Sequence, residues 1–88
     1  MSESKSFFVV QEPNYTVVVD APAEAEGDAL KIVMFVRMQA GVVQGAPGTE
    51  APPKLSRQML PNHFLTNMQE YQRIRYWVID SDLPQADE

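Results

Sequence analysis

Residues 7–19 read Phe-Phe-Val-Val-Gln-Glu-Pro-Asn-Tyr-Thr-Val-Val-Val, and this stretch predicts the centre of a β-sheet. Aromatic and β-branched side chains favour the pleated strand, and here they form two runs, 7–10 and 15–19. Between the runs, Pro13 and Asn14 suit the second and third positions of a β-turn. The stretch therefore predicts an antiparallel hairpin.

The sequence changes character twice after this hairpin. Residues 20–28 carry four carboxylates and no base, with Pro22 and Gly27 near the two ends, which predicts a solvated acidic connection. From Leu30 to Met38 apolar side chains then stand at alternate positions. A long third strand is the preferred interpretation of this alternation.

A second change of pattern follows a long irregular segment. Residues 41–56 hold three of the four glycines and three of the seven prolines, which predicts a loop. Beyond it, four apolar side chains recur at helical spacing and predict a helix over 61–72. These four are Leu60, Phe64, Met68 and Tyr71.

The last regular element is expected at residues 73–80, where apolar and polar side chains alternate again. The Tyr-Trp-Val-Ile sequence at 76–79 favours a strand. The competing interpretation extends the helix through Val78, because that position also fits a 3.6-residue period.

These elements predict an α+β fold: a small antiparallel or mixed sheet of about four strands with one helix packed on one face. The expected chain order is strand, strand, strand, loop, helix, strand. Residues 1–80 are expected to form one domain, because a chain of 88 residues supports a single hydrophobic core. Residues 81–88 are expected to form an acidic tail.

Composition restricts the classes of function. The chain has 12 acidic and 7 basic side chains, a net charge of −5, so it lacks an overall field that attracts phosphate backbones. The charge is segregated: residues 29–79 hold six bases and two acids, and carboxylates dominate both flanks. No cysteine is present, which removes disulfides and thiol chemistry. With no long apolar run near the start, a cytoplasmic protein without a membrane segment is expected.

Signals for catalysis and metal binding are weak. His63 is the only histidine, and no Gly-x-Ser-x-Gly motif accompanies it. Glu24, Glu26 and Asp28 have the alternate spacing of a calcium loop, but the glycine and glutamate that such a loop needs at its sixth and twelfth positions are missing. No glycine-rich phosphate motif occurs. We therefore expect no enzymatic activity, no cofactor and no metal.

The strongest functional signal is apolar surface that one helix cannot cover. The second face of the expected sheet would expose apolar side chains beside arginines, a combination typical of protein interfaces. The expected partner-binding residues are Val33, Phe35, Arg37, Arg73, Arg75, Trp77 and Ile79. In the competing interpretation the 41–56 loop folds over this face as a lid.

We therefore expect a non-enzymatic protein-interaction domain that binds a second copy of itself or another protein through this face or an edge strand. Small acidic proteins without cysteine occur among bacterial and phage adaptors, assembly factors and inhibitors, which is an association of composition only. The alternative is a single-stranded nucleic-acid-binding protein, in which Arg37, Arg73 and Arg75 contact phosphates beside Trp77.

Overall fold

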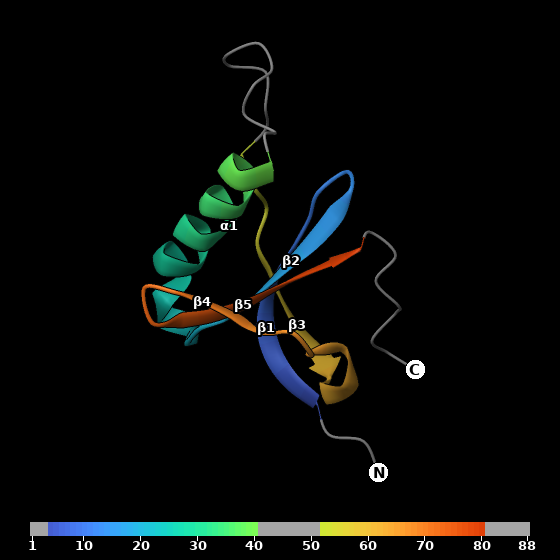
Figure 1. Cartoon of the computed structure of the whole chain (residues 1–88). Coiled ribbons are helices and arrows are strands. Elements are labelled where there is room, and N and C mark those ends of the chain that lie inside the picture. Colours follow the sequence, from blue (N-terminus) through green and yellow to red (C-terminus); the bar gives the residue numbers. More distant parts are fainter. Residues whose placement is uncertain (1–3, 41–51, 81–88) are drawn as a thin grey trace.

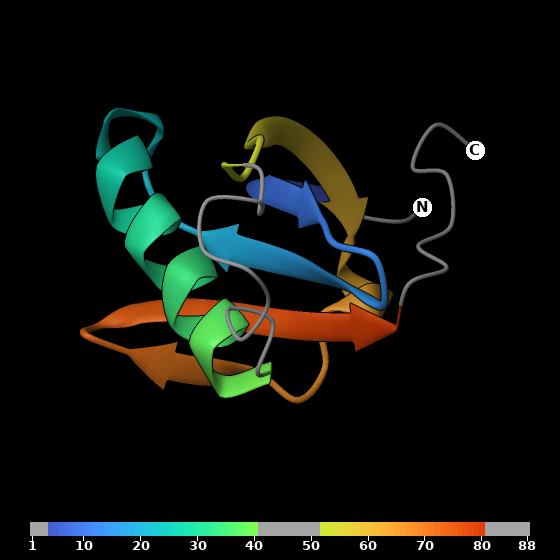
Figure 2. The same ribbon diagram turned by 90° about the horizontal axis from the view of Figure 1, so that it is seen from above.

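The computed structural model describes residues 4–40 and 52–80. Five strands form one antiparallel sheet in the order β3-β1-β2-β5-β4, and one α-helix packs on one face. Figure 2 shows the helix in front of the sheet, with the five strands in this order from top to bottom. The predicted α+β class is confirmed, with one strand more than the four expected.

Along the chain, the strands and the α-helix occupy the following residues. They are β1 (Ser4–Gln11), β2 (Tyr15–Asp20), α1 (Glu26–Ala40), β3 (Ser56–Pro61), β4 (Gln69–Tyr71) and β5 (Ile74–Asp80), with short 3₁₀ turns η1 (Ala23–Ala25) and η3 (Asn62–Phe64) (Figure 1).

The predicted hairpin forms the centre of the sheet. Strands β1 and β2 pair antiparallel, with Val9 opposite Val18. The turn closes where Pro13 and Asn14 predicted it, and the Glu12 N–H donates a 2.8 Å hydrogen bond to the Tyr15 carbonyl. The predicted strand at 73–80 is also confirmed: β5 pairs with β2 over six residues.

The prediction of a third strand over 30–38 is wrong, because these residues belong to helix α1. The buried positions of α1 are Ala29, Ile32, Val33, Val36 and Arg37, the spacing of an amphipathic helix. The alternation at 30–38 arose because three exposed positions of the helix, Leu30, Met34 and Met38, are also apolar. The carboxylates assigned to a solvated connection include Glu26 and Asp28 in the first turn of α1, where negative charge favours the helix dipole.

The main core lies between α1 and the sheet. Alternate residues of the central strands point at the helix, among them Phe8, Val17 and Tyr76. They pack against Ile32 and Val33 of α1, and these two side chains are at most 1% exposed. Burial of this apolar surface holds the helix on the sheet.

The prediction of a helix over 61–72 is also wrong. Pro61 ends strand β3, a single 3₁₀ turn follows, and residues 69–71 form β4. The backbone has positive φ at Asn67 (59°), Gln72 (53°) and Arg73 (69°), which an α-helix excludes. The apolar spacing of 60, 64, 68 and 71 therefore did not reflect a helix.

Residues 62–68, which we call the crossover, connect the two edges of the sheet, because β3 and β4 lie at opposite ends of the strand order. The crossover lies on the face opposite α1, where Leu65 packs on Phe7 and Trp77. The second face of the sheet thus carries a small core of its own. Its buried members are Phe7, Val9, Val18, Leu60 and Trp77.

The expectation of an uncovered second face is therefore corrected: the chain itself covers much of it. The proposed lid at 41–56 falls partly outside the described residues, which resume at Pro52. Of its described part, Leu55 packs on the helix side of the sheet, not on the second face. The expected acidic tail at 81–88 also lies outside the described residues.

Candidate functional site

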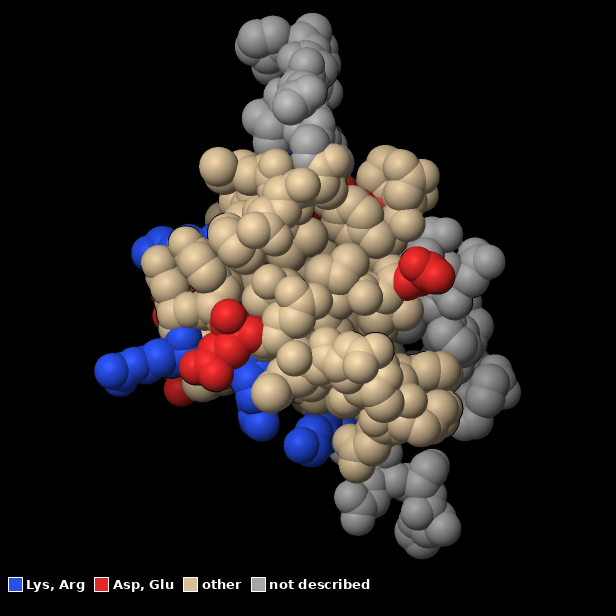
Figure 3. Space-filling view, viewed as in Figure 1, with Lys and Arg blue, Asp and Glu red and all other residues tan. Residues whose placement is uncertain are grey.

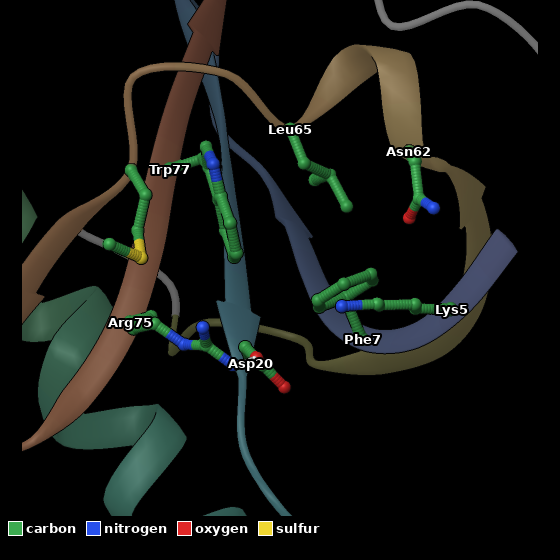
Figure 4. A pocket seen from close by; sticks show the side chains of 8 residues that line it. Lys5, Phe7, Asp20, Asn62, Leu65, Arg75 and Trp77 are labelled. Atoms are coloured by element: carbon green, nitrogen blue, oxygen red, sulfur yellow. Dashed lines mark hydrogen bonds and ion pairs between the residues drawn. The ribbon is translucent and has the colours of Figure 1, made fainter.

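A concave site lies between the crossover and the second face of the sheet. We call it the crossover pocket; its volume is about 270 Å³. The strands contribute five residues and the crossover three, so segments distant in sequence build the site. The lining residues are Lys5, Phe7, Asp20, Arg75 and Trp77 from the strands, and Asn62, Leu65 and Met68 from the crossover (Figure 4).

Aromatic and aliphatic side chains form the inner wall of this pocket. The rings of Phe7 and Trp77 meet edge to face with centroids 5.5 Å apart. Trp77 is 6% exposed, and its indole Nε1–H is buried with no acceptor among the described residues. Leu65 faces this wall from the crossover (Figure 4).

Charged side chains border the other sides of the pocket. Arg75 donates a hydrogen bond from Nη2 to Asp20 Oδ2 at 2.8 Å, and Lys5 points from β1 into the pocket (Figure 4). Among residues 4–40 and 52–80, no carboxylate forms an ion pair with Lys5. The lining therefore holds two cations and one anion.

A second candidate surface lies on the outer side of α1. We call it the α1 groove; its lining residues are Leu30, Lys31, Met34, Phe35 and Met38 from α1 and Tyr71 from β4, around a volume of about 520 Å³. Leu30, Met34 and Met38 follow each other at four-residue intervals and are 38%, 39% and 68% exposed. The groove is thus an apolar surface open to solvent.

An aromatic stack supports one wall of the α1 groove. The rings of Phe35 and Tyr71 are nearly parallel, at 10°, with centroids 4.0 Å apart. Phe35 also meets Tyr76 edge to face at 6.4 Å. These contacts join α1 to the edge strand β4 and to its neighbour β5, and they leave Met34 and Met38 exposed.

The structure separates the seven predicted partner-binding residues. Arg75, Trp77 and Ile79 share the second face of the sheet, as expected, but Trp77 is buried. Val33 is completely buried between α1 and the sheet, and Phe35 lies in the α1 groove. Arg73 occupies the β4–β5 turn.

Arg37 is the clearest departure from its expected role. Its Nε donates to Glu12 Oε2 at 2.8 Å and its Nη2 to Oε1 at 3.3 Å, and the two side chains are 8% and 4% exposed. This buried ion pair ties α1 to the β1–β2 turn. Arg37 is therefore on the helix side of the sheet, away from Arg75 and Trp77. The three arginines and Trp77 that were expected to contact single-stranded nucleic acid do not share one surface.

Sequence reasoning missed the residues that complete the two sites. Lys5 shares a face with Phe7 because they stand two apart in β1, but the predicted strand began only at Phe7. Asn62, Leu65 and Met68 had no comparable signal, because their segment was assigned to a helix. Met34 and Met38 belonged to the alternating apolar positions of 30–38, assigned to a strand that does not form.

The residues considered for catalysis and metal binding line neither site. His63 is exposed on η3, with its ring 4.1 Å from that of Phe64. Within residues 4–40 and 52–80, no three His, Asp or Glu side chains are grouped so as to hold a metal ion. In the same ranges, no helix combines the length and apolar character needed to cross a membrane.

Comparisons with known proteins found no relative of this chain. The chain matches no protein-family model, no curated protein and no solved structure.

Proposed function

We propose that this chain is a non-enzymatic protein-interaction domain that self-associates through the α1 groove and acts as a small adaptor, assembly factor or inhibitor. The observation that carries the proposal is the row of Leu30, Met34 and Met38 along α1, which we call the ridge. These side chains are exposed beside the Phe35–Tyr71 stack. Large apolar side chains grouped on a surface typically mark an interface.

The geometry of the ridge suits a second copy of the same chain. A two-fold interface needs one surface patch that is complementary to itself. If two α1 helices pack antiparallel about Met34, Leu30 of one copy lies opposite Met38 of the other. Methionine is flexible and polarizable, which lets such a contact adapt.

The distribution of charge also favours a second copy of the chain as the partner at the α1 groove. Two copies of a chain with a net charge of −5 repel each other, and this repulsion is weakest where they meet at a surface without carboxylates. The only charged side chain in the lining of the α1 groove is Lys31. On the face seen in Figure 3, the Lys and Arg side chains lie along the left and lower edges, and a few Asp and Glu side chains lie among large areas of other residues.

The size of the groove predicts a reversible dimer. Helix α1 has 15 residues and is therefore about 22 Å long. One helix pair of this length falls in the small class of interfaces, below about 1,200 Å² in total. We expect a dissociation constant on the order of micromolar to millimolar.

The test is sedimentation velocity of the full chain over a wide range of protein concentration. Wild type should shift from monomer to dimer, and Met34→Lys should remain monomeric, because it places a charge at the centre of the ridge while keeping a good helix former. The matched control is Met59→Lys, which changes an exposed methionine of β3 at the opposite edge of the sheet. A wild type that stays monomeric up to millimolar concentration, or equal dimerisation of Met34→Lys and wild type, would contradict the proposal.

A further inference from the structure

We propose that the crossover pocket binds a monocarboxylate that carries an aromatic or branched apolar group. The inference is independent of the α1 groove, because the two sites lie on opposite faces of the sheet and share no lining residue.

The apolar part of this ligand fits the inner wall. Leu65 and the exposed edge of Trp77 present methyl and ring surface, and the buried Phe7 ring packs against Trp77. Met68, which is 46% exposed, adds a flexible thioether at the edge. Apolar pockets with a few placed polar groups are typical of small-ligand sites. An aromatic ring can meet the exposed edge of Trp77, beside Leu65 and Met68, in edge-to-face geometry.

The carboxylate fits the charged border. Lys5 supplies an ammonium group that points into the pocket (Figure 4). Arg75 uses Nη2 for Asp20, and a guanidinium has five N–H donors, so it retains donors for a second anion.

The charge balance and the size select the ligand class. Two cations and one carboxylate leave one net positive charge, which matches a monoanion better than a phosphate monoester carrying about −1.5 to −2. The volume of about 270 Å³ is just below the range of roughly 300–1,000 Å³ for pockets that hold drug-sized molecules. One amino-acid residue with a free carboxylate is therefore a suitable probe.

The probes are N-acetyl-phenylalanine and a peptide acetyl-Gly-Gly-Gly-Phe with a free carboxyl end, each compared with its carboxamide. Binding is followed by fluorescence of Trp77, the only tryptophan, and by NMR shifts of the labelled full chain. We expect the acids to bind with dissociation constants on the order of 0.1–1 mM and the amides about tenfold more weakly. If the peptide binds more tightly than N-acetyl-phenylalanine, the ligand carboxylate is the C-terminus of a polypeptide. If the peptide does not bind and N-acetyl-phenylalanine does, the ligand is a small free acid.

Variants at the border test the assigned contacts. Lys5→Met keeps the apolar stem and should weaken binding of the acids about tenfold, whereas it leaves binding of the amides unchanged. Asp20→Asn releases Arg75 and should strengthen binding about threefold. The matched control is Lys54→Met, an exposed lysine outside the pocket. Thermal unfolding of each variant establishes that it is folded.

Several results would overturn the inference. These are no binding of either acid at 10 mM, equal binding of acids and amides, or no response to Lys5→Met in a folded variant. An oligothymidine serves as a further probe. If it binds in a manner that depends on Lys5 and Arg75 while the acids do not bind, the pocket is a nucleic-acid site and the proposal is wrong.

Discussion

Tyr15 has a hydroxyl group that is buried without a hydrogen bond within the described part of the chain, although buried polar groups normally have a partner. Its phenolic oxygen is buried and has no hydrogen-bond partner among the described residues. Burial raises the pKa of Tyr15 above its ordinary value of 10.0, the Glu12 carboxylate raises it further, and Arg37 opposes the rise. The pKa of Tyr76 is also raised by burial, but the Tyr76 hydroxyl donates to Gln69 Oε1 at 3.1 Å.

This contrast predicts different effects of removing the two hydroxyls. Tyr15→Phe should leave the free energy of unfolding at pH 7 unchanged or raise it by up to about 1 kcal/mol, because no hydrogen bond is lost. Tyr76→Phe should lower it by about 1 kcal/mol. Urea unfolding at pH 7 measures both, and a loss above about 1 kcal/mol in Tyr15→Phe would show that its hydroxyl has a partner.

The same tyrosines predict how stability depends on alkaline pH. A folded-state pKa above the unfolded value means that the folded chain holds the proton more tightly, so stability is fully present below about pH 10 and falls as pH rises further. Unfolding between pH 9 and pH 11 should therefore show a shallower decline in Tyr15→Phe than in wild type. A decline of equal slope would contradict the raised pKa of Tyr15.

At the scale of elements, the β4–β5 hairpin is built on an unfavourable turn sequence. Tyr71 pairs with Ile74, so Gln72 and Arg73 form a two-residue loop, and both have positive φ. A type I′ turn requires positive φ at both positions, for which Asn-Gly is the preferred sequence. Each non-glycine residue in this region is strained by about 1–2 kcal/mol.

Arg73→Gly should therefore raise the free energy of unfolding by about 0.5–1 kcal/mol, because glycine adopts positive φ without a steric penalty. Arg73→Ala is the control: it removes the same charge but keeps the Cβ atom, so it should give no such gain. Thermal and urea unfolding measure both variants. Equal stabilisation by alanine and glycine would assign the effect to charge and contradict the turn geometry.

Helix α1 shows why period alone misassigned an element. Leu30 to Met38 satisfies a two-residue alternation, but Ala29, Ile32, Val33 and Val36 satisfy the helical spacing equally well. A helix that is apolar on both sides fits several periods at once. The length of the segment then distinguishes a helix from a strand, because strands are usually shorter than about 10 residues. The 15 residues of α1, with carboxylates in the first turn, favour a helix.

At the scale of the whole molecule, the crossover covers the face of the sheet opposite α1, which no helix of the described residues covers. Figures 1 and 2 place α1 on one side of the sheet, and the crossover joins the edge strands on the other. Leu65 is its contact with the core around Phe7 and Trp77. The chain thereby buries two sheet faces with one helix and a seven-residue connection.

Leu65→Ala should accordingly lower the free energy of unfolding by about 2 kcal/mol, the lower end of the range for buried leucines because Leu65 is partly exposed. Fluorescence of Trp77 should shift to longer wavelength as water reaches the ring. The matched control is Leu30→Ala on the outer side of α1, which should cost less than about 0.5 kcal/mol below the concentration of dimerisation. Equal losses in the two variants would show that the crossover does not cover the second core.

The sequence by itself determined the central hairpin, strand β5 and the α+β class. Strings of β-branched and aromatic residues around Pro13-Asn14 have a strong local preference for two paired strands. It also determined that Arg75, Trp77 and Ile79 share a face, because alternation in a strand is independent of the rest of the fold.

Only the tertiary structure decided where the remaining residues lie. The strand order places β3 and β4 at opposite edges, and this forces residues 62–68 across the sheet instead of into a helix. Burial against the β1–β2 turn converts Arg37 from an expected surface residue into the partner of Glu12. Both outcomes depend on contacts between segments 25 or more residues apart, and the free energy of those contacts outweighs the weak local preferences of the segments.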